Sequence, residues 1–225
     1  KKDLFMEYVS PEDENMIEQF RNKSGFFSPA FADPTVFIVN KNLIGDIKME
    51  GFEDLLNPEL KGKIAFGDPM SDKAWDFVDK FIANLDGKMS TSSGQLHKSV
   101  ADGEYPVGLT WEDPVVNYIK NGAPVEVVFP KEGAIFPGES VQIIKGAKNE
   151  ENAKKFVDYM LSEKIQNLVG GELTVRPLRK DAKLASYMVP TDDIVLVKLY
   201  DEGWVSANKD AITTKFNEHL EKSLN

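Results

Sequence analysis

The feature that most constrains this chain is the alternation of short strand-like runs with amphipathic, helix-like segments. Residues 35–39 have the sequence TVFIV, a β-branched and aromatic run that follows Asp33-Pro34 and predicts a buried strand. Further strands are predicted at 63–66, 107–110, 125–129 and 140–144. Strands that alternate with helices are typical of the α/β class, so we expect an α/β fold.

Apolar residues at helical spacing predict the intervening helices. Ser71 is a suitable N-cap for a helix to residue 85, with Asp72 at the favourable end of its dipole. Other helices are expected from Ser92-Ser93-Gly94 to Gly103, over 115–120, and from about 206 to 222. One long helix is predicted over 149–168, with an inner face of Ala153, Phe156, Val157, Met160, Leu161 and Leu168.

Composition narrows the classes of function. The chain of 225 residues has no cysteine, which excludes disulfides, thiolate metal sites and cysteine nucleophiles. His97 and His219 are far apart and neither has a second histidine one turn away, so no zinc site is expected. The net charge of −10, with scattered Lys and Arg, disfavours nucleic acid as a partner. We expect neither a metal nor a cofactor.

Six stretches, in this order, carry a resemblance to a known family. They are ADPT at 32–35, FGDP at 66–69, GEYPVGLTWED at 103–113, PKEG at 130–133, KGAKN at 145–149 leading into AKKF at 153–156, and RPLRKD at 176–181. The chain resembles the type II periplasmic solute-binding proteins of ABC importers, in the group that binds iron(III), sugar phosphates or phosphonates. The resemblance covers nearly the whole chain, and six stretches in order are more specific than any one alone.

The resemblance implies two α/β lobes that close over a ligand held in the cleft between them. It also implies a lobe one that is incomplete, because family members usually carry roughly another half-lobe before residue 1. Whether the chain is a fragment or is completed by another chain stays open. The implied division is 1–33 and 133–173 for partial lobe one, 38–128 and 180–225 for lobe two, and hinge segments at about 29–39, 127–134 and 174–179.

Two predicted helix starts are candidate anion sites. Backbone amides and the helix dipole favour an anion at a helix N-terminus, and Ser71 would add a hydroxyl there. Asp72 opposes a phosphate if it faces the ligand. Ser92, Ser93 and Gly94 offer hydroxyls and close backbone approach at the second start. The alternative at both places is an ordinary helix cap without a ligand.

The end of the strand at 107–110 is a third candidate. Ligands in open α/β sheets gather at the carboxyl ends of strands, where Thr110, Trp111, Glu112 and Asp113 follow one another. Carboxylates accept hydrogen bonds from sugar hydroxyls, and Trp111 can stack on a sugar ring. The alternative is a helix capped by Asp113 with Trp111 in the core. Glu132 is expected to accept a bond from either a ligand hydroxyl or a hinge amide.

Other residues receive structural expectations. Arg176 and Arg179 favour a salt bridge near the third hinge over ligand contact, and His97 is expected at the surface or behind the site. Ferric-binding members of the family place two neighbouring tyrosines where this chain has residues 110–114. Tyr105 and Tyr118 are isolated and are expected to pack. This difference counts against direct iron binding.

The sequence therefore predicts a passive binder, not an enzyme. It would capture a small anionic solute, a sugar phosphate or an organophosphonate, and deliver it to the membrane permease of an ABC transporter. A periplasmic or extracellular location follows, with a lipid anchor on the full-length precursor left open. The alternatives are a ferric-binding protein, a receptor ectodomain, and a hydrolase using Glu112 and Asp113. The last is disfavoured because adjacent strand residues face opposite sides.

Overall fold

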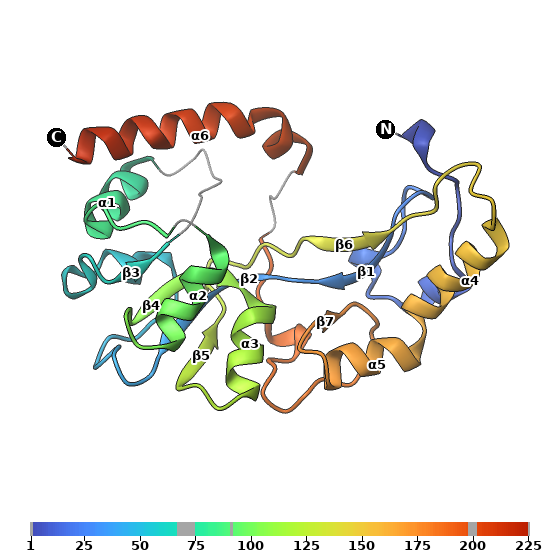
Figure 1. Ribbon diagram of the computed structural model, residues 1–225, viewed down its shortest axis with the longest axis horizontal. Helices are drawn as coiled ribbons and strands as arrows, with labels where there is room; N and C mark the ends of the chain where they lie inside the picture. The colour runs from blue at the N-terminus through green and yellow to red at the C-terminus, as the bar shows by residue number, and fades with distance from the viewer. Residues whose placement is uncertain (1, 67–74, 91, 198–201, 225) are drawn as a thin grey trace. The chain divides into compact units, whose positions relative to one another are not determined.

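The computed structural model describes residues 2–66, 75–90, 92–197 and 202–224, and the chain divides into two compact units (Figure 1). Unit 1 comprises Lys1–Pro34 and Phe136–Pro190, and unit 2 comprises Thr35–Ile135 and Thr191–Asn225. Each unit combines a sheet with helices, so the predicted α/β class is confirmed.

Residues 180–190 belong to unit 1, whereas the sequence assigned them to lobe two. Backbone amides explain the difference. The N–H of Lys183 donates to Asn167 Oδ1 at 2.8 Å, and the N–H of Ala185 donates to the carbonyl of Gly170 at 2.9 Å. Both bonds fix this stretch against a helix of unit 1. The remaining lobe and hinge boundaries stay predictions.

The sheet of unit 1 has three antiparallel strands in the order β6 (Gly138–Val141), β1 (Ser28–Ala32) and β7 (Arg176–Pro177). The strand expected at 140–144 is β6, which begins and ends earlier in the chain. Strand β1 was predicted only as part of a hinge segment. Pro29 weakens the strand signal in the sequence of β1. The register of β1 with β6 is irregular between Pro29 and Phe31.

Two helices pack on this sheet, α4 (Glu150–Leu161) and α5 (Glu163–Gly171). The single helix predicted over 149–168 is wrong, because Ser162 adopts an extended backbone with ψ 153°. Phe156 is 55% exposed and Leu168 is 37% exposed, so two of the six predicted inner positions are also wrong. The core of unit 1 consists of Met16, Ala30, Ala32, Ile143, Val157, Leu161 and Leu178.

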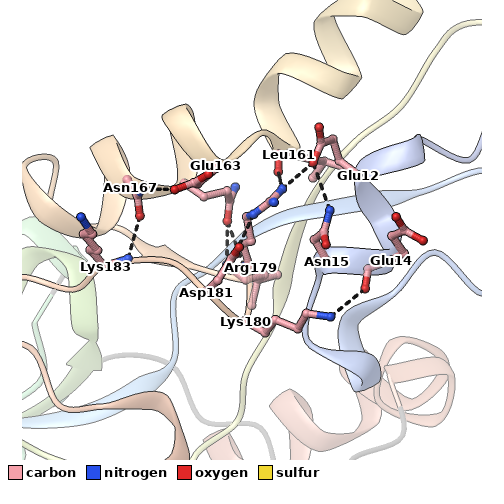
Figure 2. A network of polar contacts seen from close by, with 12 residues as sticks. Glu12, Glu14, Asn15, Leu161, Glu163, Asn167, Arg179, Lys180, Asp181 and Lys183 are labelled. Atoms are coloured by element: carbon pink, nitrogen blue, oxygen red, sulfur yellow. Dashed lines mark hydrogen bonds and ion pairs between the residues drawn. The ribbon is translucent and has the colours of Figure 1, made fainter.

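The N-terminal segment of unit 1 forms three short 3-10 helices, η1 (Lys2–Leu4), η2 (Pro11–Asn15) and η3 (Glu18–Phe20). Polar contacts tie it to the rest of the unit (Figure 2). The guanidinium of Arg179, which is largely buried, pairs with Glu12 and, at 2.7 Å, with Asp181. The salt bridge predicted for Arg179 is thus confirmed, and Arg176 donates to the carbonyl of Val189 at 2.8 Å.

The sheet of unit 2 has four strands in the order β3 (Ile64–Ala65), β4 (Val107–Trp111), β2 (Thr35–Asn40) and β5 (Val125–Val128). Strands β3 and β4 are parallel, and β2 is antiparallel to both of its neighbours. All four lie where the sequence predicted strands. Alternate residues of β2 enter two different cores, so both faces of this sheet are covered.

Helices α2 (Ser93–Ala101) and α3 (Glu112–Lys120) cover one face of the unit 2 sheet (Figure 1). The other face packs against α1 (Trp75–Leu85), η4 (Phe52–Leu56), η5 (Pro58–Leu60) and α6 (Glu202–Leu224). A last 3-10 turn, η6, spans Thr191–Asp193. Among the described helices, none is both long and apolar enough to cross a bilayer.

Candidate functional site

Two of the predicted ligand-binding segments lie together at one end of the unit 2 sheet. His97 Nδ1 is 3.4 Å from Thr110 Oγ1, and Leu96 packs over Gly108. The end of α2 lies at the start of β4, because the side chain of Asn40 donates to the carbonyl of Val100 at 2.8 Å and the backbone N–H of Asn40 donates to the carbonyl of Pro106 at 2.8 Å. Helix α2 therefore runs antiparallel to β4, and its first turn lies where β4 ends. Here β4 passes directly into α3, so the starts of two helices meet the carboxyl end of one strand.

The first turn of α2 is open to solvent. Ser92, Ser93 and Gly94 are all exposed, and nothing lies within 4 Å of the position a Cβ on Gly94 would take. Ser92 is the N-cap, and its hydroxyl accepts the N–H of Gln95 at 3.2 Å. The capping role considered as the alternative is therefore present. It is compatible with an anion at the same place, because the helix dipole and hydroxyls still face the solvent.

Of the four candidate residues at the junction of β4 and α3, two are accessible to solvent and two are buried. Trp111 is 38% exposed and Asp113 is half-buried, while Thr110 and Glu112 are buried, Glu112 to 1%. Trp111 does not lie in the core, contrary to the alternative considered for it. Only Trp111 and Asp113 present side-chain surface to a solute, and Thr110 and Glu112 lie beneath them.

Glu112 and Asp113 form the first turn of α3, and the N-cap position is Trp111, not Asp113. The strand geometry assumed for this pair is thus incorrect. Successive helix residues still point about 100° apart, so the two carboxylates remain poorly arranged for joint acid–base chemistry. Their acidic charge suits the positive end of the helix dipole.

His97 lies behind the site, which is one of the two positions expected for it, although the sequence assigned it no role in binding. Its ring lies between α2 and α3, with its centroid 6.1 Å from that of Tyr118. Burial lowers the pKa of His97, and the negative charge of Asp113 acts in the opposite direction. A usable signal was present in the sequence, because His97 follows Ser93 by four residues and therefore shares its helix face.

The remaining candidates are Glu132, Ser71 and Asp72. Both carboxylate oxygens of Glu132 accept the backbone N–H of Phe52 at the start of η4, at 3.2 and 3.3 Å. Ser71 and Asp72 fall outside the residues that the structure describes. Within the described parts of the chain, no group of three or more His, Asp and Glu side chains is close enough to hold a metal ion.

Comparison with known proteins now identifies the family. The model of the family described as "Bacterial extracellular solute-binding protein" matches residues 1–193. The chain belongs to this family. The predicted resemblance to type II periplasmic solute-binding proteins, and with it the two-lobe α/β architecture, is confirmed by the solved structures that share the fold.

Two of those structures are periplasmic binding proteins. P5PA is 26% identical with a TM-score of 0.75, and the match covers 96% of this chain and 77% of that one. AfuA from Actinobacillus pleuropneumoniae, solved with fructose 6-phosphate, is 24% identical with a TM-score of 0.78, covering 97% and 77%. At that level of identity AfuA supports the fold alone.

The chain is also similar in sequence to curated proteins of Haemophilus influenzae. Spermidine/putrescine-binding periplasmic protein 1 of Haemophilus influenzae is 38% identical over 148 residues, covering 65% of this chain and 38% of the relative. An uncharacterised protein of the same organism is 29% identical over 191 residues, covering 73% and 55%. The chain thus spans about half the length of the curated relatives it matches.

Proposed function

We propose that this chain captures a small anionic solute, a sugar phosphate or an organophosphonate, outside the cytoplasm and delivers it to the membrane permease of an ABC transporter. The observation that carries the proposal is the meeting of the exposed start of α2 with the carboxyl end of β4. Membership of the solute-binding family supports the transport role, and no catalytic step is proposed.

Each end of such a solute has a matching group. The amides and hydroxyls of Ser92, Ser93 and Gly94 would hold the acidic end, helped by the dipole of α2. Trp111 would stack on the sugar ring, and Asp113 would accept hydrogen bonds from the sugar hydroxyls. In this proposal, Thr110 and Glu112 support the site from below. Ser71, Asp72 and Glu132 keep the ligand-binding roles that the sequence predicts for them.

A second candidate is a polyamine, and two observations favour it. Several relatives are named spermidine/putrescine-binding proteins, one of them 38% identical. The exposed Trp111 and the half-buried Asp113 are also only two residues apart in the chain, and an aromatic face together with a carboxylate suits an ammonium group. The same carboxylate works against a phosphate. The charge of Asp113 therefore separates the two candidates.

The test is a thermal-shift and calorimetric screen of the chain against fructose 6-phosphate, a small organophosphonate, putrescine, spermidine and Fe(III). A solute at 100 times its Kd adds about 2.7 kcal/mol of stability to the folded state. We expect Asp113→Asn to preserve or tighten binding of an anion and to weaken binding of a polyamine. Glu126→Gln, which changes an exposed carboxylate on β5, is the matched control.

Stabilisation by a phosphorylated sugar or a phosphonate, lost in Trp111→Ala, would support the anionic proposal. Stabilisation by putrescine or spermidine alone, with a loss in Asp113→Asn, would replace it by the second candidate. Stabilisation by Fe(III) alone would redirect the search to oxygen ligands. If no solute in the panel changes the melting temperature, the proposed function is refuted.

A further inference from the structure

His97 lies between α2 and α3, the two helices whose first turns form the candidate site. Its imidazole contacts the hydroxyl of Thr110 at 3.4 Å on one side and faces Tyr118 of α3 on the other. It lies one turn into α2, directly behind the exposed residues of the first turn. A change in its charge would therefore act at short range on anything bound at that turn.

The electrostatic surroundings of His97 are simple. Helix α2 packs against β2, β3, β4 and α3, and the three strands contain no ionisable side chain. The ionisable residues of α3 are Glu112, Asp113, Tyr118 and Lys120, and on α2 itself Lys98 pairs with Asp102. Asp113 is the residue whose charge acts on the imidazole. Of these side chains, the imidazole of His97 is the one whose ordinary pKa lies near neutral pH.

We propose that His97 sets the charge preference of the solute site. Protonation of the imidazole adds a positive charge behind the first turn of α2, which favours an anion and disfavours a cation. The inference rests on the proposed solute-binding function and deepens it, because it names the residue that makes binding depend on solute charge and on pH.

Thermodynamic linkage allows the inference to be tested by measuring the pKa of His97 with and without a bound solute. If protonation of His97 changes solute affinity, the bound solute must change proton affinity by the same factor. A bound anion should raise the pKa of His97 by about half a unit to one unit, which corresponds to a threefold to tenfold gain in affinity on protonation. A bound cation should lower it by a similar amount.

The experiment is an NMR pH titration of the histidine ring protons, with and without saturating fructose 6-phosphate or putrescine. The chain has two histidines, and His97→Gln assigns the spectrum. His219 pairs with Asp79 and stacks on Trp75 between α6 and α1, so its ring signals serve as an internal control. Isothermal calorimetry at pH 5 and pH 8, on the wild-type chain and on His97→Gln, measures the affinities.

A shift of His97 in the stated direction, with a wild-type pH dependence of Kd that flattens in His97→Gln, supports the inference. Comparing the two proteins removes any contribution from the phosphate of the solute, which also titrates near pH 6. A solute that binds by calorimetry but leaves the His97 titration unchanged overturns the inference and leaves the proposed function standing. Absence of binding by every solute at both pH values overturns both.

Discussion

Replacing Gln166 by leucine tests how unit 1 is held together. The side chain is fully buried, at 0% exposure, and it makes four hydrogen bonds to backbone. Its Nε2 donates to the carbonyls of Ala30 at 2.9 Å and Met160 at 3.0 Å, and its Oε1 accepts the amides of Leu178 at 2.9 Å and Arg179 at 3.1 Å. One side chain thus joins the end of α4, strand β1 and the residues after β7.

The expected loss follows from what leucine leaves behind. Leucine has nearly the volume of glutamine, so the cavity contribution is small. Buried carbonyls without a donor are tolerated more often than buried amides without an acceptor. Each amide has a single hydrogen, and the amides of Leu178 and Arg179 lose their acceptor. A buried amide without an acceptor costs about 1–3 kcal/mol. We therefore expect Gln166→Leu to lower the free energy of unfolding by about 2–6 kcal/mol.

The assay is urea unfolding followed by far-UV circular dichroism, with amide hydrogen exchange of β1 as a local measurement. Tryptophan fluorescence is unsuitable, because Trp75, Trp111 and Trp204 all belong to unit 2. Gln19→Leu, at an exposed glutamine of unit 1, is the control and should change stability by less than about 0.5 kcal/mol. A loss below about 1 kcal/mol in Gln166→Leu would refute the reasoning.

Two further predictions concern the same unit. Gly170→Ala would bring a Cβ within 2.7 Å of the carbonyl oxygen of Lys183 and should destabilise the folded chain by about 1–3 kcal/mol. A Cβ at Gly171 meets nothing within 4 Å, so Gly171→Ala should stabilise the folded chain by up to about 1 kcal/mol. Equal urea midpoints for the two variants would contradict this prediction. Burial and a hydrogen bond to Asp158 raise the pKa of Tyr8 to about 12. The phenol ionises near pH 10 in the unfolded chain, so its contribution to the free energy of unfolding is full below pH 10 and is lost as the pH rises to about 12. The stability advantage of the wild type over Tyr8→Phe, measured by urea titration, should therefore shrink over that range.

The strands of unit 2 were predictable because their signal is local. Residues 35–39 are β-branched or aromatic throughout, and a strand covered on both faces needs apolar side chains at every position. Strand β1 carries no such signal. Its sequence is SPAFA, and it is a strand because β6 and β7 bond to its two edges, which is a long-range condition.

The break between α4 and α5 could not be predicted from the spacing of apolar residues. Apolar spacing continues through Ser162, so the pattern predicts one helix, but Gln166 needs the carbonyl of Met160 and a strand carbonyl at the same time. The extended backbone of Ser162 turns the chain and resets the helical phase. Ile165 and Val169 then face inward and Leu168 outward. Apolar spacing identifies positions that can be buried, and the tertiary partners select among them.

The two segments of the candidate site were predictable from the sequence, but their meeting and the combination of charges that results were not. Strand ends and helix starts are recognisable from sequence, so Ser92 to Gly94 and Thr110 to Asp113 could be proposed separately. Their meeting depends on the direction of α2 relative to β4, which two contacts fix: His97 with Thr110 near the end of the strand, and Asn40 with Val100 near its start. The site then presents two opposite electrostatic features, the positive end of α2 and the carboxylate of Asp113. A solute that satisfies both carries an acidic group and hydroxyl or ammonium donors, and the charge on His97 shifts the balance between them.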